Sequence, residues 1–123
     1  MMGRIEEFTC DGESFIYFDF SGFKINYEFK RLTTEGKAII EKYPKQSVYT
    51  ITNIKGILFD TQTKEIFAQW AEHNKPYVKQ GAMIGMDGIK KIMMGSVLEI
   101  SGRENVGYAH TKEQAIKLLL SSE

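Results

Sequence analysis

The sequence predicts an α/β protein built on a single, mostly parallel sheet. Apolar residues alternate along the whole chain between the two-residue period of strands and the longer period of helices. A hairpin signal near the N-terminus precedes this alternation, and the chain contains only two prolines. The predicted order is β-β-α-β-α-β-α-β-α, with an antiparallel N-terminal hairpin at one edge and right-handed crossovers between the other strands. The length of 123 residues suits one domain, residues 1–123.

The N-terminal hairpin is predicted from Asp11-Gly12, a dipeptide that tolerates the positive φ angles of a tight turn. It joins strands over Arg4–Cys10 and Glu13–Phe20. The second strand is apolar on both faces, which is typical of a strand inside a covered sheet. An amphipathic helix is then expected between Phe23 and Tyr43, ending before Pro44. Its apolar stripe consists of Phe29, Leu32, Ile39, Ile40 and Tyr43.

The middle of the chain repeats the pattern of strand and helix. Residues Ser47–Thr52 are short and β-branched, which favours a strand. Asp60 or Thr61 can cap the helix that follows, and this helix is expected to end near Asn74. Its predicted inner face consists of Ile66, Phe67, Trp70 and Ala71.

The last third of the chain contains two more strands, each followed by a helix. Tyr77–Met86 is predicted to be a strand, and Asp87 can cap the helix after it. The inward face of that helix is predicted to consist of Ile89, Ile92, Met93, Ser96, Val97 and Ile100. A short strand is expected over Asn105–His110. Thr111 and Gln114 form a capping-box pattern before the final helix, whose predicted inner face consists of Ala115, Ile116, Leu119 and Leu120.

The charge balance excludes two classes of partner. Sixteen basic residues face sixteen acidic ones, so the formal net charge is zero. A nucleic-acid binder or a polybasic membrane patch would require an excess of basic residues, so neither is expected. No run approaches the roughly 18 apolar residues of a spanning helix, and the N-terminus does not have the layout of a signal peptide. With Cys10 as the single cysteine, no disulfide is expected, and a cytoplasmic location is predicted.

Catalytic and metal-binding patterns are missing from the sequence. His73 and His110 have no metal-ligand spacing, and Cys10 has no histidine close by in sequence. Glu6 and Glu7 point to opposite faces of a strand, so they do not converge for acid–base chemistry. Neither a Walker A loop nor a G-x-G-x-x-G motif is present. We therefore expect no enzyme activity, no cofactor and no metal.

The stretch "NKPYVKQGAMIGMDGIKKIMMG" carries the strongest candidate for a binding site. Gly85, Asp87 and Gly88 lie where the carboxyl end of a predicted strand meets a helix, and ligands of open α/β sheets collect at such ends. Asn53 and Lys55 follow the neighbouring strand and would complete a cleft. The alternative is structural: the glycines allow close backbone approach, and Asp87 occupies the helix N-terminus and disfavours an anion.

The order of elements, together with "NKPYVKQGAMIGMDGIKKIM" and the later "ISGR…VGYAHTKEQAIKLLL", resembles the SpoIIAA-like family, small bacterial proteins of the STAS/SEC14 type. The resemblance covers Ser14 to Leu120. Its most specific residues are Lys75-Pro76-Tyr77, followed by Gly85, Gly88 and Arg103. It implies a non-catalytic regulatory or protein-interaction module similar to anti-sigma-factor antagonists, with Arg103 as a further candidate binding residue.

Those antagonists are switched by phosphorylation of a serine at the start of the helix after the central strand. Here Asn53 stands where the preceding aspartate is expected, and the segment after the central strand has no serine. The only hydroxyl groups nearby belong to Thr52, Thr61 and Thr63. The module is therefore expected to lack the usual serine switch.

The SEC14 side of the resemblance implies a second function, the carrying or sensing of a lipid or small apolar molecule. The methionine-rich segment "IKKIMMGSVLEI" could adapt to such a guest, although it could equally form core. A carrier would need a cavity of at least roughly 300 Å³ between the sheet and the helix Asp87–Ile100. Met94 and Leu98 lie off the predicted inward stripe, so we expect them to be exposed and to form a partner surface or a homodimer face.

Overall fold

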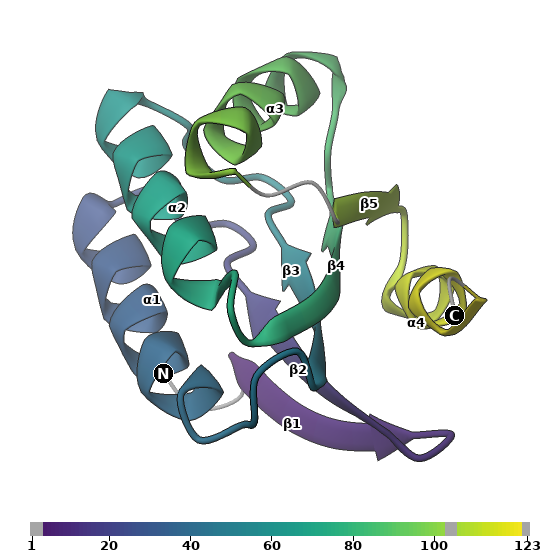
Figure 1. Cartoon of the computed structure of the whole chain (residues 1–123). Coiled ribbons are helices and arrows are strands. Elements are labelled where there is room, and N and C mark those ends of the chain that lie inside the picture. The colour runs from purple at the N-terminus through teal and green to yellow at the C-terminus, as the bar shows by residue number, and fades with distance from the viewer. Residues whose placement is uncertain (1–3, 103–105, 122–123) are drawn as a thin grey trace.

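A computed structural model describes residues 4–102 and 106–121, and these residues form one sheet with four helices (Figure 1). The elements occur in the predicted order β-β-α-β-α-β-α-β-α. Their bounds are β1 Ile5–Cys10, β2 Glu13–Asp19, α1 Asn26–Ile40, β3 Val48–Asn53, α2 Thr61–Asn74, β4 Val78–Ile84, α3 Gly88–Ser101, β5 Val106–Ala109 and α4 Lys112–Ser121.

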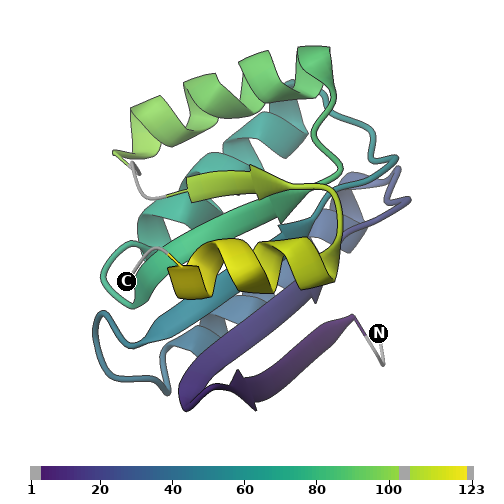
Figure 2. The ribbon, with the colours of Figure 1, turned by 90° about the vertical axis from the view of Figure 1, so that its right-hand side faces the viewer.

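The sheet follows the order of the sequence, β1-β2-β3-β4-β5. β1 pairs antiparallel with β2, and each later strand pairs parallel with the one before it. β1 and β5 therefore form the two edges of the sheet (Figure 2). The predicted fold class and hairpin are confirmed.

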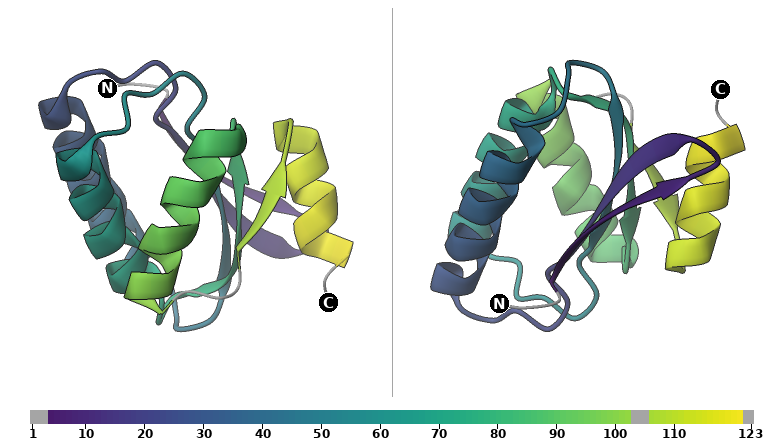
Figure 3. Two further views of the ribbon diagram at one scale, coloured as in Figure 1. Left: turned by 90° about the horizontal axis from the view of Figure 1, so that it is seen from above. Right: turned by 90° about the horizontal axis from the view of Figure 1, so that it is seen from below.

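The helices cover the two faces of the sheet unequally. α1, α2 and α3 lie on one face, and α4 lies alone on the other (Figure 3). The larger core, under the three helices, is aromatic at its centre. The ring centroid of Phe20 lies 5.2 Å from that of Phe67, 6.0 Å from that of Phe29 and 6.1 Å from that of Trp70. Phe20 directly follows β2, so this cluster joins the end of β2 to both α1 and α2. Edge-to-face and offset aromatic pairs of this kind stabilise the contact between elements.

The smaller core lies between the sheet and α4. Ala115 and Leu119 of α4 are fully buried there, as predicted, together with Phe15, Tyr49 and Ile51 of the sheet. α4 contacts β3, β4 and β5.

Lys112 of α4 reaches the β1–β2 end of this face. Its ammonium forms an ion pair with Glu6 and lies 4.9 Å from the ring centroids of Phe8 and Tyr17. Glu7 contacts the opposite face through Tyr43, so the two glutamates diverge, as predicted.

The predicted helix starts are confirmed by their hydrogen bonds. Asp60 accepts the backbone N–H of Thr63 at 2.8 Å, and this bond is the main reason why the pKa of Asp60 lies below its ordinary value. Thr111 accepts the N–H of Gln114 at 3.1 Å. The Gln114 side chain in turn accepts the N–H of His110, one residue before the cap.

The predicted inward face of α3 is wrong in part. Val97 is fully buried, as predicted, but Ile92 is 77% exposed, whereas Met94 is 1% exposed and Leu98 is partly buried against the larger core. α3 is apolar around much of its circumference, so its sequence contains two overlapping stripes. The stripe through Met94 and Val97 turns inward because α3 packs against α2 as well as against the sheet. Met94 is therefore core rather than partner surface, and the homodimer face expected there loses its basis. The side chains of Ile89 and Ile100 lie outside the described residues.

No helix in the described part of the chain combines the length and the apolar character needed to cross a membrane.

Candidate functional site

Two loops meet at the carboxyl ends of the parallel strands, where α1 and α2 begin. The backbone N–H of Leu58, in the loop before α2, donates to the carbonyl of Phe23, in the loop before α1, at 2.9 Å. The ammonium of Lys24 donates to the carbonyl of Gly56 at 2.6 Å. The two loops therefore form one continuous, hydrogen-bonded surface.

Three large apolar side chains are exposed on this surface. Ile25 is 63% exposed, Tyr27 is 67% exposed and Leu58 is 46% exposed. We call these three residues the apolar end surface. Ile25 and Leu58 lie on the two joined loops, and Tyr27 lies in the first turn of α1. A single exposed apolar residue is ordinary, but a group of them at one end of a sheet is typical of an interaction site.

Ile25 occupies a position where a polar residue is usual. It is the N-cap of α1, and its side chain has no acceptor for the free N–H groups of the first turn. The helix start is held instead by Glu28, whose carboxylate accepts the backbone N–H groups of Lys24 and Ile25 at 3.2 Å each. Glu28 thus supplies one half of a capping box and leaves the isoleucine facing outward.

The structure brings together the strand ends that carry Asn53, Lys55 and Gly85, as predicted. Asn53 donates its amide to the hydroxyl of Tyr17 at 3.0 Å and accepts the backbone N–H of Lys55 at 3.0 Å. A further bond links Ile54 N–H to the carbonyl of Ile84 at 2.9 Å. Asn53 is thus already engaged within the protein.

Gly85 is required by backbone geometry. Its φ is 88°, and a Cβ atom at this position would lie 2.5 Å from the backbone nitrogen of Lys55. Only glycine tolerates both conditions. The backbones of the two strand ends therefore lie close together here, as the structural interpretation of this glycine predicts.

Asp87 and Gly88 fit the structural interpretation only in part. Asp87 caps α3, as predicted, by accepting the N–H of Lys90 at 3.2 Å. Gly88 differs, because no atom lies within 4 Å of a Cβ placed there. Arg103 lies outside the described residues.

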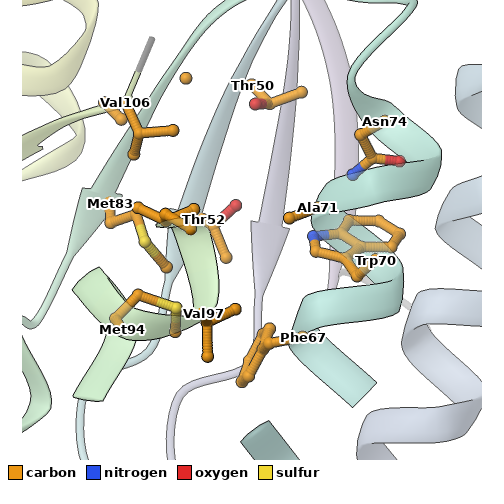
Figure 4. A pocket seen from close by; sticks show the side chains of 13 residues that line it. Thr50, Thr52, Phe67, Trp70, Ala71, Asn74, Met83, Met94, Val97 and Val106 are labelled. Carbon is orange, nitrogen blue, oxygen red and sulfur yellow. The ribbon is translucent and has the colours of Figure 1, made fainter. Parts of the chain in front are cut away.

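A small cavity lies between α2, α3 and the sheet (Figure 4). Its volume is about 40 Å³, enough for about three water molecules. Phe67, Met83, Met94 and Val97 form much of its apolar wall. Its polar groups belong to Thr50, Thr52, Trp70 and Asn74. No pattern in the sequence predicted that these four residues would come together.

The histidines and the cysteine do not gather into a site. Both ring nitrogens of His73 have partners, with Nε2 lying 2.7 Å from a Glu41 oxygen and Nδ1 lying 2.9 Å from Asn74 Oδ1. Cys10 is a free thiol on β1. Among the residues that the structure places, no group of three or more His, Cys, Asp or Glu side chains could hold a metal ion.

No protein-family model and no curated protein matches this chain. The geometry of the structure offers two candidate binding sites, the apolar end surface and the cavity beneath α3.

Proposed function

We propose that the protein is a non-catalytic interaction module that binds another protein through the apolar end surface. The observation that carries this proposal is the exposure of Ile25 and Leu58 on two loops that hydrogen bonds hold together, with exposed Tyr27 in the first turn of α1 directly after one of them. Because the loops are already fastened, binding would require little ordering of the backbone. This keeps the entropic cost of association low.

The resemblance to anti-sigma-factor antagonists supports the same location. Their switch lies at the start of the helix after the central strand, and Leu58 lies in the corresponding loop between β3 and α2. Thr52 and Thr63 are buried, and the hydroxyl of Thr63 lies 3.2 Å from Asn26 Oδ1. A kinase could reach neither hydroxyl without local opening, whereas Thr61, the first residue of α2, is exposed. Because the segment after β3 has no serine, we propose binding without the serine switch.

The charges around the apolar end surface suggest the chemistry of the partner. Lys24 and Lys55 are both exposed beside it, whereas the nearby carboxylates of Glu28 and Asp60 already accept backbone N–H groups. A partner with apolar side chains flanked by carboxylates would match this arrangement, because complementary charges at the rim of an interface favour association.

The carrier function has weaker support. An acyl chain would need at least roughly 300 Å³, and the cavity between α3 and the sheet has about 40 Å³. The small volume of the cavity therefore favours the interaction module over the carrier.

The test is quantitative affinity capture from a lysate of the source organism. The double variant Tyr27→Ser, Leu58→Ser should lose at least about tenfold in partner enrichment, since central aromatic and aliphatic contacts dominate interface energies. Its thermal stability should stay close to that of the wild type, because both side chains are exposed.

Tyr108→Ser is the matched control, because Tyr108 is also an exposed tyrosine but lies on β5, at one edge of the sheet. This variant should capture the partner as the wild type does. Equal enrichment by the wild type and the double variant would contradict the proposal.

A further inference from the structure

Four hydrogen-bonding groups border the cavity between α2, α3 and the sheet. They are the hydroxyls of Thr50 and Thr52 on β3, the indole N–H of Trp70 and the amide of Asn74 on α2. All four residues are more than nine-tenths buried, and Asn74 is 3% exposed. Burial of a polar group without a partner is unfavourable. These four groups are therefore expected to have hydrogen-bond partners.

Within the described residues, only the oxygen of the Asn74 amide has an internal partner among these groups. Asn74 Oδ1 lies 2.9 Å from His73 Nδ1, which leaves the NH₂ group of the amide free to donate. Within the described residues, neither this NH₂ group nor the Trp70 N–H nor either threonine hydroxyl has a hydrogen-bond partner. The same residues contain no fully enclosed side-chain N or O atom without a partner. The free groups therefore border accessible space, and that space is the cavity.

The side chains point in the required direction. Figure 4 shows the nitrogen atoms of Trp70 and Asn74 on the sides that face the threonines across the cavity. The packing of α2 fixes the indole, because Trp70 lies edge-on to Phe18 with centroids 4.8 Å apart and abuts Gly36 of α1. Two N–H donors on α2 and two hydroxyls on β3 are thus fixed in position around the cavity.

The rest of the wall is apolar and adaptable. Met83 and Met94 line the side opposite α2 (Figure 4), and methionine side chains can move to fit irregular guests. In the part of the chain that the structure covers, no charged side chain lines the cavity. A charged ligand would lose its hydration there without gaining a counter-charge.

We infer that this cavity is a binding site for a small neutral molecule that has a hydrogen-bond acceptor at one end and methyl or methylene groups at the other. The acceptor faces the donors of Trp70 and Asn74 and the hydroxyl of Thr52, and the apolar end lies against Met83, Met94 and Val97. The volume limits the ligand to a few non-hydrogen atoms unless the methionines move. This site is separate from the apolar end surface and does not depend on the proposed protein partner.

The test is a titration followed by nuclear magnetic resonance. Trp70 is the single tryptophan of the chain, so its indole N–H gives one assignable signal at the proposed contact. N-methylacetamide is the probe, because it is small and neutral and has both a carbonyl acceptor and methyl groups. Acetate is the matched charged control.

The indole signal should shift saturably with N-methylacetamide and not with acetate. Thr52→Val keeps the shape of the side chain but removes a hydroxyl, and it should weaken binding by about tenfold. Val97→Phe should fill the cavity and abolish the shift. The inference is overturned if N-methylacetamide gives no saturable shift, if acetate shifts the signal equally, or if both variants bind as the wild type does. The first result would mean that the cavity holds water alone, the second that it does not select neutral ligands, and the third that the probe binds elsewhere.

Discussion

At the scale of single residues, Gly36 sets how closely α1 and α2 approach each other. A Cβ at this position would lie 2.3 Å from Cη2 of Trp70 and 2.9 Å from Cε1 of Phe18. Both neighbours are rings in a packed aromatic cluster, so neither can move away cheaply. Gly36 therefore also fixes the indole that borders the cavity.

Replacement of Gly36 by alanine should lower the free energy of unfolding by about 1–3 kcal/mol, because the added methyl group overpacks the core. Urea denaturation would measure this loss. Gly95→Ala on α3 is the matched control, because no atom lies within 4 Å of its added Cβ. The better helix propensity of alanine should raise the free energy of unfolding of this variant by up to about 1 kcal/mol. Equal stability of Gly36→Ala and the wild type would show that α1 and α2 are further apart.

A second residue-scale effect concerns pH. Tyr43, after α1, donates its hydroxyl to Glu7 of β1 at 2.7 Å. Burial, and secondarily this bond and the charge of Glu7, raise the pKa of Tyr43 to about 12 from its ordinary value of 10.0. Since the folded-state pKa is the higher one, the stabilisation is fully present below pH 10.0 and is lost as the pH rises towards about 12.

Tyr43→Phe should therefore lower stability by about 0.5–1.5 kcal/mol at neutral pH, and the difference from the wild type should shrink above pH 10.0. Thermal unfolding of both proteins across this pH range would measure it. A difference that stays constant up to about pH 12 would exclude the bond to Glu7 as its source.

At the scale of elements, the sequence predicted where helices begin better than which face they bury. Asp60, Asp87 and Thr111 were identifiable as caps because capping depends on a few neighbouring residues. The buried face of α3 depends on its contact with α2, which is distant in sequence. Apolar periodicity could not choose between two stripes that both fit a helix.

The orientation of α3 can be tested with two substitutions on the same helix. Met94→Ala should cost about 2–5 kcal/mol because Met94 is buried. Ile92→Ala should change stability by no more than about 0.5 kcal/mol because Ile92 faces solvent. Chemical denaturation would compare the two variants. A larger loss for Ile92→Ala would mean that α3 is rotated towards the face first predicted from its sequence.

At the scale of the whole molecule, the alternation of strands and helices was enough to predict the order of elements and the parallel sheet. The close approach of Gly85 to Lys55 could also be predicted from the sequence, since parallel strands end at the same edge of a sheet. The apolar end surface could not be predicted, because the loops that carry Ile25 and Leu58 meet only after β3 has paired with β2. One signal was present in the sequence: an isoleucine at a helix start, where a polar cap is usual.

The cavity was also beyond the reach of the sequence. Thr50 and Thr52 looked like ordinary strand residues, and Asn74 looked like the end of a helix. Their common environment arises from the docking of α3 over β3 and α2, and no local pattern encodes that docking. Polar residues that tertiary packing buries together are therefore found only once the fold is known.

Site-specific photo-crosslinking in cells tests the central claim, that this is a binding module with its contact surface at the carboxyl ends of the strands. A photoreactive phenylalanine analogue would replace Leu58 on that surface or, as control, the exposed Lys117 of α4. We predict one discrete protein adduct from position 58 and none from position 117. Adducts from position 117 alone, or from neither position, would contradict the claim.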